Sequence, residues 1–238
     1  MKAEVEASSL LQEVIRSRPN NRPFIIKLGN IDDLTEVQIP GHKKIMLKAD
    51  RAVTLKCLSK SNEHKHLQVQ RDASLTLEGQ ITLQGTNYKG NTQYALYVEN
   101  GGKAEIKNGV TITSFKNGNI GPVVSAGNLI MSGGTITGNQ AKNGGGVYIH
   151  ASWGSFTMIG GTIEENTADK GGGVYSQGNF TMSGETITKN TATGHGKAVM
   201  LNYNFHWEGG EIKDNRGNGP VVGGSGGYFQ NNCHGTAS

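Results

Sequence analysis

Four stretches of the chain carry the same order of apolar, small and polar residues. They are residues 129–139 (LIMSGGTITGN), 156–166 (FTMIGGTIEEN), 180–190 (FTMSGETITKN) and 205–215 (FHWEGGEIKDN). Each has two apolar residues two positions apart, a bend containing glycine, an isoleucine, and an asparagine three residues later. Apolar and polar residues alternate before the bend, which is typical of a β-strand with one buried face.

A second short apolar strand precedes each stretch and sets the period of the repeat. The first apolar residues of these strands recur after 24, 27 and 25 residues, at Val123, Val147, Val174 and Val199. Weaker copies begin at Leu67, Leu96 and Val221, so seven rungs (turns of the coil) are visible. A period of about 25 residues with several short strands and no helical pattern predicts an all-β fold, a single-stranded right-handed parallel β-helix.

The segment before the repeats predicts a cap. Residues 3–17 place apolar side chains on one face of an amphipathic helix, which would cover the exposed edge of the first rung. We predict one domain over 1–238, divided into a cap helix and entry (1–22), irregular rungs (23–94), regular rungs (95–222) and an incomplete rung or tail (223–238). A partner or a further stretch of chain is expected to cover the C-terminal end.

The repeated asparagines and glycines are predicted to belong to the scaffold. The asparagines of the repeat are Asn139, Asn166, Asn190 and Asn215. They recur at one corner, where a tight turn favours a residue that tolerates positive φ, and stacked asparagines can hydrogen-bond to one another as a ladder. Glycine pairs mark the other corner. Because Gly184-Glu185 breaks the pair in one rung, we expect only the first glycine to be required.

Composition fits a rod better than a compact globule. The 238 residues include 36 glycines and 5 prolines, and only 34% are hydrophobic, which a solenoid tolerates because each rung needs few apolar residues. Much of the net charge of +4 arises between residues 42 and 66. This segment has seven Lys and Arg residues, and its only acidic residues are Asp50 and Glu63. Cys57 and Cys233 lie at opposite ends of the chain and are expected to be free thiols. No apolar stretch is long enough to span a membrane.

One column of side chains is a candidate binding surface. If the second short strand alternates, its outward residues are Tyr97, Val124, Tyr148, Tyr175, Met200 and Val222. An exposed apolar column of this kind could stack on sugar rings or bind a protein. The alternative is that a neighbouring loop covers these side chains.

Candidate chemistry elsewhere is sparse. The acidic residues that could approach one another on one face of the late rungs are Glu185, Glu208, Glu211 and Asp214. Paired carboxylates could perform acid–base chemistry on a polysaccharide, and the alternative is a solvated polar face. The spacing of His and Cys does not resemble a metal site, and we predict no cofactor. Nucleic acid is not an expected partner, because no aromatic stacking platform accompanies the basic cluster.

The segment GGGVYIHASWGSFTMIGGTIEENTADKGGGVYSQGNFTMSGETITKNTA resembles the repeats of bacterial right-handed β-helix surface proteins, and more distantly the polymorphic membrane proteins. The opening SLLQEVIRSRPNNRPFIIKLG is similar to the cap helix and first strand of pectin-lyase-like folds. The resemblance implies a secreted or surface-anchored protein, often an adhesin or antigen, with carbohydrate-active enzymes as relatives.

Three hypotheses about function follow. The first is a non-catalytic surface or extracellular protein that binds glycans or host proteins, whose signal or anchor is expected outside the present sequence. The second is a relative of polysaccharide lyases or hydrolases. The third is a structural stalk or phage-tail-type rod.

Overall fold

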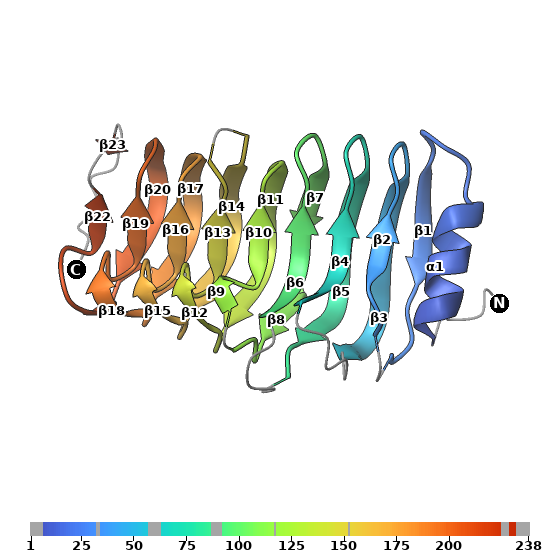
Figure 1. The fold of residues 1–238 in the computed structure, drawn as a ribbon, viewed down its shortest axis with the longest axis horizontal. Helices are drawn as coiled ribbons and strands as arrows, with labels where there is room; N and C mark the ends of the chain where they lie inside the picture. The colour runs from blue at the N-terminus through green and yellow to red at the C-terminus, as the bar shows by residue number, and fades with distance from the viewer. Residues whose placement is uncertain are drawn as a thin grey trace.

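The computed structural model describes residues 7–31, 34–56, 63–86, 92–116, 118–151, 153–224 and 229–231. Parallel strands stack rung upon rung into a rod, with a helix against its N-terminal end (Figure 1). The rod has about 7 turns of about 26 residues each. The predicted right-handed parallel β-helix is therefore confirmed. Cys57, Cys233 and the predicted tail over 232–238 lie outside the described residues.

Three parallel sheets form the sides of the rod. The first sheet contains β1 (Pro23–Lys27), β3 (Lys44–Lys56), β5 (Ser74–Gln84), β7 (Lys103–Ile106), β8 (Thr111–Thr113), β11 (Asn128–Thr137), β14 (Ser155–Glu164), β17 (Asn179–Thr188), β20 (Phe205–Lys213) and β23 (Phe229–Asn231). The second sheet contains β2 (Val37–Ile39), β4 (Glu63–Val69), β6 (Thr92–Val98), β10 (Val123–Ser125), β13 (Val147–Ile149), β16 (Val174–Ser176), β19 (Val199–Leu201) and β22 (Val222–Gly224). The third sheet contains β9 (Gly118–Ile120), β12 (Gln140–Asn143), β15 (Thr167–Lys170), β18 (Thr191–His195) and β21 (Arg216–Gly217).

The core consists of like side chains stacked along the axis. Phe156 pairs with Phe180 and Phe180 with Phe205, with parallel rings whose centroids are 5.1 and 4.6 Å apart. A column of isoleucines, represented by Ile163 and Ile187, is fully buried beside them. Burying one such side chain stabilises the fold by about 1.5–3 kcal/mol, so a thin apolar line in each rung is enough to hold the rod together.

Helix α1 (Ser8–Ser17) covers the first rung and confirms the predicted cap. Its apolar face buries Leu11 and Ile15 completely. The Gln12 side chain donates to the Gln38 carbonyl (3.0 Å) and accepts from the Gln38 amide (2.7 Å), so it satisfies the edge of β2 as a further strand would. Residues 3–6 of the predicted helix lie outside the described part of the chain.

The asparagines form a buried ladder. Each Nδ2 donates to the next Oδ1, from Asn139 to Asn166 (3.0 Å), from Asn166 to Asn190 (3.0 Å) and from Asn190 to Asn215 (3.1 Å). Each Oδ1 also accepts the backbone amide of the corresponding residue one rung earlier, starting with Phe115. The ladder thus satisfies backbone and side-chain groups inside a corner that water cannot reach.

The expectation that the asparagines themselves adopt positive φ is wrong. Positive φ belongs to the residue before each asparagine, at Gly138, Glu165, Lys189 and Asp214. That residue turns the chain outward, and the turn directs the following asparagine side chain into the rod.

The glycine bend has two separate requirements. The first glycine, such as Gly160, has no room for a Cβ because the Ser132 carbonyl oxygen lies against it. The second position needs positive φ, which Gly161 adopts at 87° and Glu185 adopts at 65°. Because Glu185 takes the second position in one rung, a non-glycine residue is tolerated there, at a conformational cost of about 1–2 kcal/mol.

Candidate functional site

The predicted tyrosine column lies on the outer face of the second sheet. Strand pairing places its members in the order Tyr97, Val124, Tyr148, Tyr175 and Met200. The expected exposure is wrong, since Tyr148 and Tyr175 are only 9% and 8% exposed and Val124 is buried. Tyr94 and Ile120 help to cover the column, so these side chains form a second, smaller apolar cluster outside the sheet.

The tyrosines of this column already have partners. The rings of Tyr148 and Tyr175 stack on each other with centroids 5.5 Å apart and planes within 3°. The Tyr148 hydroxyl donates to Gln177, and Asn202 donates to the Tyr175 hydroxyl. Burial raises the pKa of Tyr148 above its ordinary value. With ring faces and hydroxyls both engaged, the column is scaffold and offers little surface to a ligand.

Val222 does not belong to the column. It pairs with Val199, whose side chain faces the core, and Gly223 pairs with Met200 in the outward position. The rung that ends at β22 is one residue longer than an alignment of Val221 with Val199 assumes, so Val222 faces inward and Gly223 takes the outward position.

The predicted carboxylates lie on the neighbouring strands β17 and β20 of the first sheet and in the turn that follows β20. Glu211 forms an ion pair with Lys213, and Glu208 lies 3.9 Å from Nε2 of His206. Glu185 and Asp214 occupy positive-φ positions in different rungs. Within the described ranges, no group of three or more His, Cys, Asp or Glu side chains could hold a metal ion.

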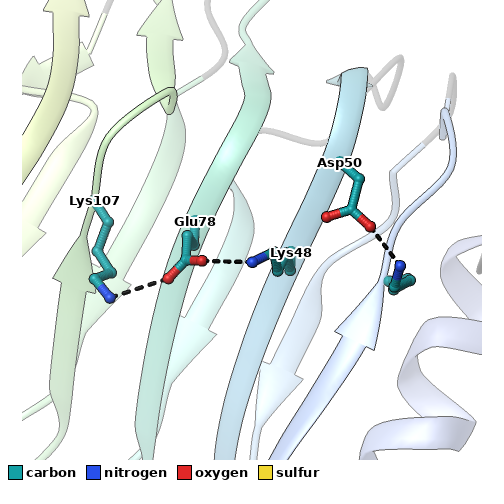
Figure 2. A network of polar contacts seen from close by, with 5 residues as sticks. Lys48, Asp50, Glu78 and Lys107 are labelled. Atoms are coloured by element: carbon teal, nitrogen blue, oxygen red, sulfur yellow. Dashed lines mark hydrogen bonds and ion pairs between the residues drawn. The ribbon is translucent and has the colours of Figure 1, made fainter.

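A row of alternating charges crosses the outer face of the first sheet in the early rungs. Glu78 accepts from Lys48 (2.8 Å) on β3 and from Lys107 (3.0 Å), and Asp50 pairs with Lys27 on β1 (Figure 2). Hydrogen bonds from Lys48 and Lys107 hold the pKa of Glu78 below its ordinary value, and Glu78 in turn raises the pKa of both lysines. We call these five residues the lysine row. It spans β1, β3, β5 and the residue that follows β7, with charges that largely neutralise one another.

Exposed aromatic side chains mark a different edge of the rod. Trp153 is 69% exposed and Tyr203 is 47% exposed, and both lie in turns that join the second sheet to the first. These turns follow the upper edge of the rod in Figure 1. The turn between them contains only Gln177 and Gly178. We call the surface formed by Trp153, Gln177, Asn179, Tyr203 and Asn204 the aromatic corner.

The aromatic corner was not among the predicted sites, because its two aromatic residues lie in turns outside the repeated strands. The available signal was turn length. The strands are joined by two residues at Gln177–Gly178, but by five residues at 150–154 and three at 202–204. A large aromatic residue in a turn of more than two residues has no core position to fill, and it therefore projects into solvent.

The fold defines this protein as a parallel β-solenoid whose repeat is scaffold and whose variable turns project from its edges. The family model for the right-handed β-helix region matches residues 48–234, and the chain belongs to that family. No curated protein and no solved structure matches the chain. In the part of the chain that the structure describes, no helix has the length and apolar character needed to cross a membrane.

Proposed function

We propose that this chain is a non-catalytic β-helix protein of a bacterial surface or secretome that binds glycans or host components through an exposed face. The observation that carries the proposal is the aromatic corner. Exposed Trp and Tyr on an otherwise polar edge are characteristic of surfaces that bind a partner, because their rings bury a large area at low entropic cost.

The position of the aromatic corner supports binding by a rigid platform. Its turns are anchored between strands whose inward residues are fully buried, such as Val147, Phe156, Val199 and Phe205. A ligand would therefore meet side chains held on a preformed scaffold, which lowers the ordering cost of association.

A binding screen combined with an activity assay tests the proposal. The protein would be applied to a glycan array and to extracellular-matrix proteins, and assayed for release of unsaturated or reducing sugars from polysaccharides. We expect saturable binding that the double variant W153A/Y203A abolishes, without sugar release. Release of sugars would instead support the enzyme hypothesis. Failure to bind any glycan or matrix protein would contradict the proposal and favour a structural stalk.

A further inference from the structure

The geometry points to a ligand class for the aromatic corner: a linear, uncharged polysaccharide chain that lies parallel to the rod axis and stacks alternate sugar rings on Trp153 and Tyr203. This inference rests on the proposed function and adds the chemistry, the orientation and the minimum length of the ligand. Three features of the aromatic corner carry it, namely the spacing of the rings, the polar floor between them and the absence of formal charge.

The spacing of the two aromatic residues follows from strand register. Val147 pairs with Val174 and Val174 with Val199, so the turns that contain Trp153 and Tyr203 are two rungs apart. Parallel strands are separated by about 4.8 Å, so these turns are separated by about 10 Å along the axis. In an extended β-linked chain, alternate rings face the same way and recur after two residues, over a comparable length. The shortest ligand that contacts both aromatic residues is therefore a trisaccharide.

The rung between the two aromatic residues forms a low polar floor. Gly178 has no room for a side chain because a Cβ there would overlap the Gly154 carbonyl oxygen. The exposed amides of Asn204 and Asn179 lie next to it, with Nδ2 of Asn204 3.3 Å from Oδ1 of Asn179. Amide groups donate to and accept from hydroxyls, which is the chemistry that the equatorial hydroxyls of a sugar require.

The absence of formal charge selects a neutral ligand. The turns at 126–127, 150–154, 177–178 and 202–204 contain no Lys, Arg, Asp or Glu. An acidic polysaccharide would find its counter-charges among the Lys and Arg residues between 42 and 66, which belong to earlier rungs. None of the five residues of the aromatic corner carries a charge that could attract it.

The shape of the aromatic corner favours a chain over a protein surface. Protein interfaces bury a broad patch around their aromatic anchors, commonly about 800 Å² on each partner. Here the two exposed aromatic residues lie in turns two rungs apart along one edge, and the turn between them contains only Gln177 and Gly178. A narrow polymer can follow that edge, whereas a folded partner would leave most of the polar floor uncovered.

Fluorescence titration of the whole chain measures the predicted contacts directly. The chain has two tryptophans, and because Trp207 is buried in the core, a stacking sugar perturbs the emission of Trp153. The probes are cellobiose, cellotriose and cellohexaose as extended neutral chains, maltohexaose as a coiled neutral chain, and polygalacturonate as an acidic chain. We expect cellotriose to bind at least about tenfold more tightly than cellobiose, and maltohexaose and polygalacturonate to bind more weakly than cellohexaose.

Variants identify the residues responsible. By calorimetry, W153A and Y203A are each expected to weaken cellohexaose binding by about tenfold or more. Y203A should also make cellobiose and cellotriose bind with equal affinity, because only the Trp153 ring then remains to stack on a sugar. I159S is the matched control, since Ile159 is 53% exposed but lies on β14 outside the aromatic corner. It should bind as the wild type does, and circular dichroism and thermal melts check that every variant is folded.

The outcomes separate this inference from the proposed function. Glycan binding that the double variant W153A/Y203A abolishes, but that shows no gain between cellobiose and cellotriose, overturns the inference and leaves the proposed function intact. Glycan binding that survives the double variant overturns both, because the aromatic corner would then not be the binding face. Preference for polygalacturonate that disappears at high salt also overturns the inference, in favour of the basic segment at 42–66. Binding of a matrix protein in place of any glycan likewise overturns the inference alone. No binding of any glycan or matrix protein overturns both.

Discussion

The early and late rungs share one backbone path but are stabilised by different means. The early rungs, β1 to β8, have an aliphatic core that includes Leu47 and Leu77, and they carry the lysine row on their outer face. The late rungs, β9 to β22, contain the asparagine ladder, the phenylalanine stack and all strands of the third sheet that the structure describes. Identical side chains in successive rungs form the buried ladder and stack of the late rungs, whereas the early rungs rely on their aliphatic core and carry paired charges on their surface.

The buried contacts of the scaffold and the exposed side chains of the surface differ in their response to salt and in their access to ligands. The ladder and the stack are buried, so their contribution is insensitive to salt and unavailable to ligands. The lysine row is partly exposed, so it is screened by salt. The aromatic corner belongs to the late rungs but departs from their repeat, and this departure makes it available for binding.

Breaking the ladder should have the largest effect on stability. N166A removes the acceptor of the Asn139 amide and of Asn139 Nδ2, and it also leaves the Ile136 carbonyl without its donor. Each buried group without a partner costs about 1–3 kcal/mol, so we expect a loss of about 3 kcal/mol or more in urea unfolding. N143A removes an exposed amide of the third sheet and should change stability by less than about 0.5 kcal/mol. Equal effects of the two variants would contradict a structural role of the ladder.

A buried histidine should make stability fall in acid. His66 precedes Leu67 on β4, at the position that Gly146 and Gly173 occupy in the late rungs. Burial lowers the pKa of His66 from 6.5 to about 3, so below pH 6.5 the unfolded chain binds a proton that the folded chain excludes. Stability should therefore decrease with falling pH by about 1 kcal/mol per unit between pH 6 and 4.

Urea unfolding at stepped pH measures this slope. H66L should flatten it, whereas H150Q, which alters an exposed histidine in the turn after β13, should leave it unchanged. If H66L kept the full slope of the wild type, the dependence would have to arise from other groups.

Relieving strain in the late rungs should stabilise the protein modestly. Glu185 adopts positive φ at the position where Gly134, Gly161 and Gly210 stand in other rungs. E185G removes a cost of about 1–2 kcal/mol, offset in part by the greater freedom of glycine in the unfolded chain, so we expect a gain of about 1 kcal/mol in thermal or urea unfolding. E164G places glycine at an extended strand position, where it relieves no strain, and this variant should lower the stability. A loss of stability in E185G would show that its side chain has a role of its own.

Breaking the lysine row should have the smallest effect. E78Q removes the negative charge that Lys48 and Lys107 share and one of the two acceptor oxygens, and it should lower the melting temperature slightly at low salt and not measurably at high salt. Because the folded pKa of Glu78 is lowered, its contribution is present above the ordinary value of 4.5 and is lost as the pH falls through the folded pKa. Melting curves at two salt concentrations and two pH values measure both effects, and a salt-independent change would contradict them.

Features that repeat from rung to rung could be predicted from the sequence. The stacked phenylalanines, the isoleucine column and the positions of the ladder follow from the period, because each rung places the same residue at the same point in space. The cap was also predictable, because an amphipathic helix that precedes a stack of strands can cover only the first rung.

Features that depend on contacts between distant segments could not be predicted. The cover over the tyrosine column includes Ile120 on β9 and Tyr94 on β6, and no periodicity relates these residues to Tyr148. The position of Val222 depends on a single residue in the length of one rung. The exposure of Trp153 depends on how a longer turn projects from the rod, and turn conformation is not repeated from rung to rung.

The most direct test of the account is the salt dependence of cellohexaose affinity in wild type and W153A. A neutral aromatic corner predicts a wild-type dissociation constant that is unchanged between low and high salt, and a W153A constant weaker by about tenfold or more at both. Affinity that falls with salt and is unaffected by W153A would contradict the account, because binding would then depend on the charged early rungs.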